Sequence, residues 1–369
     1  MSHIDLARSA RFRLLQVIGS GLCVVFVIGV LLFGSIGSGP ALLPIALAAP
    51  DRSQLLHSQT TVTTYGYLPL IRQSTGQLIV NPQSREDSLN FYLNHYVAWE
   101  NASANWTGDH NSCNPGSTSL EFRNAVLHRI NYFRAMAGIP ATVVFSDTYN
   151  AKAQAAALMM SVNSQLSHDP PASWLCYSDA GHEGVGNSNL YLGVYGWNAI
   201  TGYMRDPGGG NYFAGHRRWI LYPQTQEMGA GDIPPVSGHW SSNALWVFDS
   251  HMWGPRPATR DEFVAWPPRG YVPYQVVFAR WSFAYPSANF SNVTVSMTSN
   301  GSNVSLTLSP VVNGYGENTL VWIPLGLSDR APWPKPASDT TYTVNVQNVT
   351  IGGQNRNFTY DVIVVDPGP

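Results

Sequence analysis

The sequence is poor in charged residues and in cysteine. Only 11% of its 369 residues are charged, and 20 Lys and Arg against 22 Asp and Glu leave a formal net charge of −2. A chain without a basic face has little attraction for phosphate backbones, so we expect no nucleic-acid partner. Three cysteines are too few to hold together a small disulfide-rich domain. A nucleic-acid-binding protein and a small disulfide-rich domain are therefore excluded.

Charge is also absent from a long stretch near the N-terminus, residues 14–50. Within it, residues 17–36 are apolar and long enough to span a bilayer, and the arginines before them predict a cytoplasmic N-terminus. These are Arg8, Arg11 and Arg13. The alternative is a cleaved signal peptide, because Ala46-Leu-Ala48 fits a small-x-small processing site. Residues 1–50 thus predict a secreted protein, or a cell-surface protein held in the membrane through residues 14–37.

If the chain is exported, its cysteines can be oxidised to a disulfide. Cys23 lies in the apolar segment, which leaves Cys113 and Cys176 as the one pair that an exported chain can oxidise to a disulfide. Two unpaired thiols are the alternative.

The middle of the chain has the pattern of helices mixed with a few strands. Thr118-Ser-Leu-Glu121 is a capping box, in which the Thr118 side chain accepts a hydrogen bond from the backbone N–H of Glu121. Apolar residues behind it recur at spacings of three and four, as on one face of a helix. Further helices are expected at 146–160 and 192–204, and strands at 227–233 and 243–249. Helices interleaved with strands predict an α+β layered domain over residues 118–255.

The segments on either side of this domain differ from it. Residues 51–117 form an N-terminal extension, with a strand expected at 77–80 and a helix at 88–99. From Pro267 onward, short alternating runs are separated by Asn, Gly, Ser and Pro. They cover residues 275–279, 293–297, 304–308, 319–323, 342–346 and 358–364. This spacing, with a turn at Gly352-Gly353, predicts an immunoglobulin-like β-sandwich over residues 267–369.

Four motifs occur in a characteristic order around the alanine-rich second helix. They are His128-Arg-Ile-Asn-Tyr-Phe-Arg134-Ala, Leu166-Ser-His168, Gly215-His-Arg-Arg-Trp-Ile-Leu221 and Met228-Gly-Ala-Gly231. Through them, residues 121–232 resemble the CAP superfamily, or SCP domain, which includes cysteine-rich secretory proteins, antigen 5 and plant pathogenesis-related proteins. The bacterial branch is the most similar. The resemblance implies a three-layer αβα sandwich with a central cleft, and it implies secretion.

The resemblance also implies a set of cleft residues. Family members with a complete cleft have two histidines and two glutamates that can hold a metal ion, and His168 and His216 match the two histidines. Asp206 stands where a glutamate often follows the third helix. Ser188 occupies the other acidic position, and Glu183 is the nearby carboxylate.

The cofactor that this set implies is zinc or another divalent ion. A hydrogen-bonded polar cleft without metal is the alternative. Ser188, Asn189 and Trp219 are expected to line the cleft.

Three functions compete. We prefer a non-catalytic extracellular binding module for a lipid, a small apolar molecule or a peptide, because the acidic set is depleted and no nucleophile motif is present. The second is a hydrolase in which His168, His216 and Asp206 hold zinc, the metal activates water, and Glu183 is the base. The third is a structural surface protein that acts through its β-sandwich.

Overall fold

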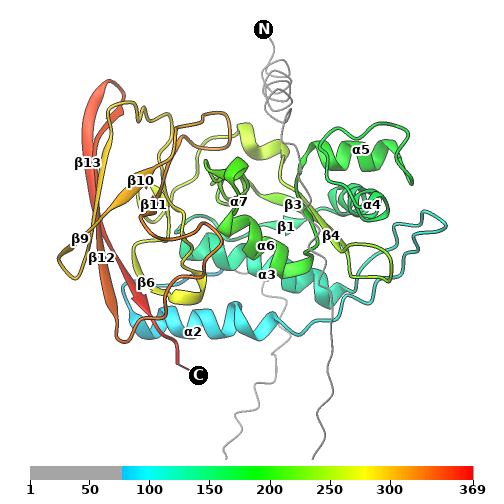
Figure 1. The fold of residues 1–369 in the computed structure, drawn as a ribbon, viewed down its shortest axis with the longest axis horizontal. Coiled ribbons are helices and arrows are strands. Elements are labelled where there is room, and N and C mark those ends of the chain that lie inside the picture. The colour runs from blue at the N-terminus through cyan, green and yellow to red at the C-terminus, as the bar shows by residue number, and fades with distance from the viewer. Residues whose placement is uncertain (1–76, 369) are drawn as a thin grey trace, which may run out of the picture. The chain divides into compact units, whose positions relative to one another are not determined.

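In the computed structural model, which describes residues 77–368, a four-stranded sheet with the order β1-β3-β4-β2 forms the centre of the first half. Its strands are Val144–Phe145 (β1), Ser188–Leu192 (β2), Glu227–Ile233 (β3) and Ser242–Trp246 (β4). β1 pairs parallel with β3, and the other pairs are antiparallel. Helices cover both faces (Figure 1), which confirms the predicted αβα layers.

One face of the sheet is covered by Asp147–Asn163 (α4) and Asp179–Gly186 (α5). The backbone of α4 lies very close to β3. A Cβ added at Gly229 would lie 2.4 Å from Tyr149, and one at Gly231 would lie 2.1 Å from the Ala153 carbonyl carbon. The two glycines and the alanines of α4 therefore let helix and strand pack with little side-chain volume between them.

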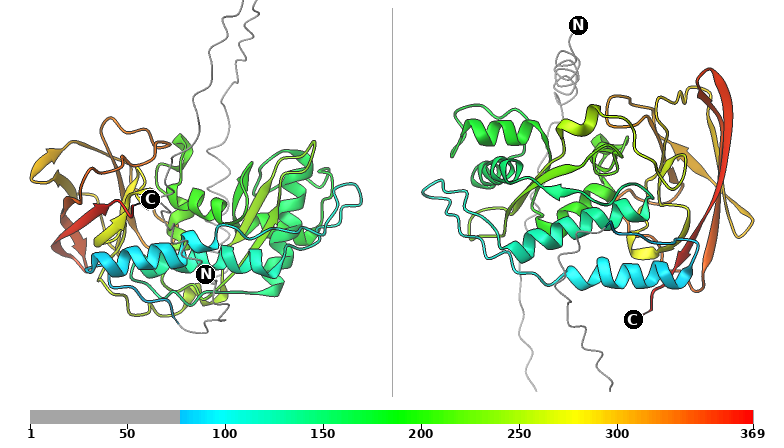
Figure 2. Two further views of the ribbon diagram at one scale, coloured as in Figure 1. Left: turned by 90° about the horizontal axis from the view of Figure 1, so that it is seen from below. Right: turned by 180° about the vertical axis from the view of Figure 1, so that it is seen from behind.

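The opposite face is covered by Leu120–Met136 (α3), Gly196–Arg205 (α6) and Gly215–Ile220 (α7), as the two views in Figure 2 show. Met228 and Leu245 point to this side and pack with apolar residues of α3 and α6 such as Ile130 and Ile200. Alternation along β3 and β4 thus gives each helical layer its own core.

Three helix starts differ from their predictions. Ser119, one residue after the expected Thr118, caps α3, because its Oγ accepts from the Phe122 N–H at 3.1 Å. The helix expected from residue 192 begins only at Gly196, since residues 188–192 pair with β4 as strand β2. The second helix begins at Asp147, one residue after the expected start at Ser146, which is its N-cap.

The N-terminal extension contributes Arg85–His95 (α2) and a 3₁₀ turn at Val97–Trp99 (η1). α2 packs against α3 through rings, with Phe91 stacked on Tyr132 at 5.3 Å. Residues 77–80 form no strand, contrary to the prediction, and no partner strand lies beside them in the described chain. The signal or anchor segment predicted within residues 1–50 lies outside the described residues. Among residues 77–368, no helix has the length and apolar character needed to cross a membrane.

The last hundred residues form two further sheets, with orders β10-β11-β7-β5 and β6-β13-β12-β8-β9. The first contains Val264–Trp266 (β5), Trp281–Ala284 (β7), Leu306–Leu308 (β10) and Thr319–Pro324 (β11). The second contains Gly270–Pro273 (β6), Thr294–Ser299 (β8), Ser302–Val304 (β9), Thr340–Ile351 (β12) and Gln354–Val365 (β13). The sheets face each other through aromatic residues, including Phe283 and Phe358 with centroids 5.1 Å apart. This confirms the β-sandwich and the turn at Gly352-Gly353.

Two predicted strands of the sandwich need correction. Residues 275–279 are not a strand, because Tyr274–Val276 form a 3₁₀ turn (η4). The run at 304–308 is split between β9 and β10, which pair in different sheets. Neither difference changes the architecture.

Within residues 77–368, the helical half and the sandwich share one hydrophobic core and belong to one compact unit. Phe133 of α3 contacts Trp266 of β5 with ring centroids 5.0 Å apart. Arg217 of α7 donates to the Ser282 hydroxyl of β7 at 3.0 Å. The domain limits of 118–255 and 267–369 stay predictions, and contacts of this kind cross the boundary between them.

Candidate functional site

His216, in the first turn of α7, is held by Asp206 at the end of α6. The Asp206 carboxylate accepts from the His216 backbone N–H at 3.0 Å and from ring Nδ1 at 2.7 Å. Because an ionised carboxylate only accepts, Nδ1 carries the proton and Nε2 is the free position. The Asp206 side chain is fully buried, whereas 24% of the His216 side chain is exposed. The pair therefore presents one ring edge to the surface.

Two opposing effects set the basicity of His216. Burial by itself lowers its pKa, but the charge of Asp206 and the hydrogen bond to it outweigh burial, so the pKa of His216 is raised above 6.5. His216 is thus the more readily protonated of the two predicted cleft histidines.

His168 lies in the bend that follows α4, and its Nδ1 is 2.8 Å from the backbone carbonyl of Val185. A carbonyl only accepts, so the Nδ1 proton is fixed and Nε2 keeps its lone pair. Burial lowers the pKa of His168 below 6.5, partly opposed by the Val185 hydrogen bond, and the charge of His216 lowers it further. The two rings come from opposite helical layers, and the charge of His216 is the third and smallest influence on the pKa of His168.

Further residues that contact His216 come from β2 and α6. Asn189 donates through Nδ2 to the His216 carbonyl at 3.1 Å, and its place in the cleft stays a prediction. Tyr203 stacks at an angle on the His216 ring, with centroids 5.3 Å apart, and its hydroxyl is 2.7 Å from Asn243 Oδ1. Tyr203 was not among the predicted residues, although its position one turn before Asp206 on the same helix is a signal for it.

The other predicted residues are placed differently. Glu183 lies on α5 in an ion pair with Lys152, at 2.6 Å, and half of its side chain is exposed. The Ser188 hydroxyl is buried and has no hydrogen-bond partner within the described range. Trp219 contacts the rings of Phe248, Tyr222 and Tyr315, and neither cleft histidine is among its ring contacts. The roles of these three residues in the cleft stay predictions.

The donor set can be compared with what zinc requires. A zinc site has at least three protein ligands, and no group of three or more His, Cys, Asp and Glu side chains in residues 77–368 is placed to hold a metal ion. The Asp206 carboxylate accepts a hydrogen bond from Nδ1 of His216, not from Nε2, and the Glu183 carboxylate forms an ion pair with Lys152. Of the predicted set, the described residues thus leave only the two histidine Nε2 atoms for a metal ion, and we derive no chemical step through one.

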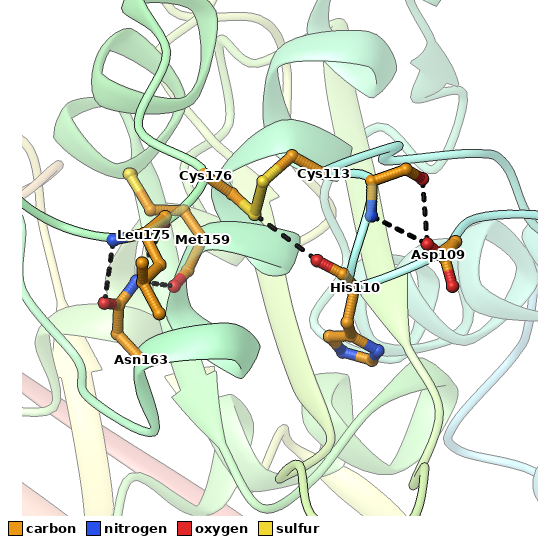
Figure 3. The surroundings of a disulfide bond; sticks show 8 residues. Asp109, His110, Cys113, Met159, Asn163, Leu175 and Cys176 are labelled. Carbon is orange, nitrogen blue, oxygen red and sulfur yellow. Dashed lines mark hydrogen bonds between the residues drawn. A yellow bond between two sulfur atoms is a disulfide. The ribbon is translucent and has the colours of Figure 1, made fainter.

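The predicted disulfide between Cys113 and Cys176 is confirmed, with the sulfurs 2.04 Å apart. It joins the loop before α3 to the segment after α4 (Figure 3). Asn163 fixes the same segment from the other side, since its side chain bonds both the N–H and the carbonyl of Leu175. A depression of about 480 Å³ lies beside the bridge and is lined by Leu158, Trp174 and Tyr177 among others.

Comparison with known proteins agrees with the layers and motifs described above. Residues 127–247 match the model of the cysteine-rich secretory protein family, CAP. Over these residues the chain has a CAP domain and is similar to that family; the bacterial branch stays a prediction. No curated protein matches the chain.

A search of solved structures finds PcoC, a methionine-rich copper resistance protein from Escherichia coli. It is similar at 17% identity and a TM-score of 0.21, over 27% of this chain and 92% of that one. A likeness at this TM-score supports no conclusion about fold or function.

Proposed function

We propose that the chain is an exported, non-catalytic binding module whose CAP domain holds its ligand between the Nε2 atoms of His168 and His216. The observation that carries this proposal is the way each ring is fixed. Both Nδ1 atoms are bonded to an acceptor, Val185 O and Asp206 Oδ1, and in the described chain neither Nε2 atom has a partner.

The two Nε2 atoms differ in character. His168, with its lowered pKa, offers a lone pair at Nε2, whereas His216, with its raised pKa, is the ring that more readily takes a second proton and can then donate from Nε2. A ligand group with one donor and one acceptor satisfies both, and the amide group of a peptide is such a group. A purely apolar molecule would desolvate both nitrogens without replacing their hydrogen bonds with water, which costs about 1–3 kcal/mol per group. Of the ligand classes considered, a peptide therefore fits the two rings best.

The test uses the full-length protein and a library of capped, fluorescently labelled decapeptides, with palmitate as the lipid comparison. His168→Ala and His216→Ala should each weaken peptide binding by about tenfold or more, the equivalent of one hydrogen bond to a charged or buried partner. His182→Ala is the matched control, since this exposed histidine is bonded to Asp169 alone. Peptide binding that is unchanged in both cleft variants would refute the proposal, as would cleavage of the bound peptides.

A metal-assisted hydrolase is the second candidate, favoured by one observation. A histidine ligand usually donates its other ring N–H to a carbonyl or carboxylate, as His168 and His216 both do. Calorimetric titration with zinc tests it. Heat that disappears in His168→Ala and in His216→Ala, together with zinc-dependent peptide hydrolysis, would favour the hydrolase over the binding module.

A further inference from the structure

A small cavity lies where α7 meets the β-sandwich. It has a volume of about 20 Å³ and is lined by Arg217 and Arg218 of α7, Ser282 and Ala284 of β7, and Glu317 and Thr319 near the start of β11. This space holds one water-sized particle and excludes a sulfate or phosphate group.

Both arginines line this cavity, and each has one buried N–H group without a partner among the described residues. Arg217 donates from Nε to the Met204 carbonyl and from Nη1 to the Ser282 hydroxyl, and its Nη2 has no partner. Arg218 donates from Nη1 to the Val312 carbonyl and from Nη2 to the Glu317 carbonyl, and its Nε has none. The residues are only 1% and 5% exposed. Buried donors of this kind are costly unless something accepts from them.

The charges around the cavity do not balance. All the bonded partners of the two guanidinium groups are neutral, and neither group forms an ion pair with another described residue. Glu317 lines the cavity, but its carboxylate is paired with Arg256. Asp206, which acts on both arginines at longer range, is bonded to His216.

Burial accordingly lowers the pKa of Arg217 to about 9 and of Arg218 to about 10, and both stay charged at neutral pH. Arg280, paired with Asp329, adds a further positive charge near Arg217. A buried charge is tolerated when a counter-ion or full hydrogen bonding compensates its desolvation. What the cavity lacks is thus a small negative charge that both guanidinium groups can share.

We propose that the cavity binds a monovalent anion of the size of chloride, held between Nη2 of Arg217 and Nε of Arg218. A water molecule would accept from both N–H groups but would leave the two charges uncompensated. The anion links the helix that carries His216 to the sandwich strand β7. It should therefore stabilise the contact between the CAP domain and the sandwich.

Crystals of the protein grown in sodium bromide in place of chloride test the site, because bromide scatters anomalously. An anomalous peak in contact with Nη2 of Arg217 and Nε of Arg218 is the expected result. Density for a water molecule without an anomalous signal would overturn the proposal, and so would bromide found only as an adventitious ion on the surface.

Thermal unfolding at constant ionic strength provides the matching solution test. Chloride and bromide should raise Tm by about 2 °C or more relative to gluconate, since a ligand that binds only the folded state stabilises it. Arg217→Gln should abolish this difference. Should that variant fail to fold, Ala284→Val fills the cavity and leaves both arginines in place, with the same expected loss. Arg85→Gln, at an exposed ion pair with Asp339, is the control that keeps the difference. A Tm that is the same in chloride and gluconate contradicts the proposal.

Discussion

Acid should weaken the contact between the N-terminal extension and the CAP domain. His95, the last residue of α2, has Nδ1 3.0 Å from Nε2 of His128 on α3, and the Trp99 ring stacks on His128 with centroids 4.1 Å apart. Two imidazoles in this geometry can share one proton in a hydrogen bond, but they cannot both be charged without repulsion.

The magnitude follows from the pKa of His128. Burial, and to a smaller extent the charge of His95, lowers it from 6.5 to about 4. At 1.36 kcal/mol for each pKa unit, this lowering of the His128 pKa corresponds to about 3 kcal/mol of unfolding free energy. Because the folded pKa lies below the unfolded value, the fold favours the neutral ring. Its contribution to stability is complete above pH 6.5 and is lost as the pH falls toward 4.

Urea unfolding at pH 7 and pH 4 measures this effect. The wild-type protein should lose about 3 kcal/mol more unfolding free energy over this interval than His128→Gln, which keeps a hydrogen-bonding side chain but cannot titrate. His182→Gln, at an exposed histidine, should lose as much as the wild type. Equal losses in the wild type and His128→Gln would refute the reasoning.

Two other features of the fold can be tested by stability. Removing the disulfide with Cys113→Ser and Cys176→Ser, which are 63 residues apart, should cost about 4 kcal/mol of unfolding free energy by loop entropy, and an unchanged urea midpoint would contradict this. Gly231→Ala should cost about 3 kcal/mol, because its Cβ would lie 2.1 Å from the Ala153 carbonyl carbon and push α4 off the sheet. Gly209→Ala is its control, with nothing within 4 Å of the added Cβ. A Tm lowered equally by both alanines would show that close packing is not the cause.

The elements that could be predicted from sequence are those whose pattern is local. The helix α4 is marked by its run of alanines, and both it and strand β3 at residues 227–233 lie where expected. Strands β5 and β7 were missed because nearly all of their residues are buried, as in Val264–Trp266, so the apolar and polar alternation that marks a strand is absent. Helix α5 was missed because eight residues give too short a window for a helical period.

Some residues of the candidate site could likewise be predicted from sequence, and others could not. His168, His216 and Asp206 could be singled out because their motifs are short and ordered along the chain. The carbonyl of Val185 could not, since a backbone acceptor has no side-chain signature. Arg280, which donates to the Asp206 carbonyl from 74 residues further along the chain, is brought there only by the contact between the sandwich and the CAP domain.

The most direct test of the central claim is an NMR titration of the histidine ring nitrogens in the full-length protein and in Asp206→Asn. We expect His168 to titrate below pH 6.5 with its neutral proton on Nδ1, and His216 to titrate above pH 6.5. Loss of the Asp206 charge should lower the pKa of His216 by about 1 to 3 units. Addition of a peptide that binds the protein should shift the Nε2 signals of both rings. If both rings titrate near pH 6.5 with the proton on Nε2, and neither responds to Asp206→Asn or to peptide, the proposed cleft is contradicted.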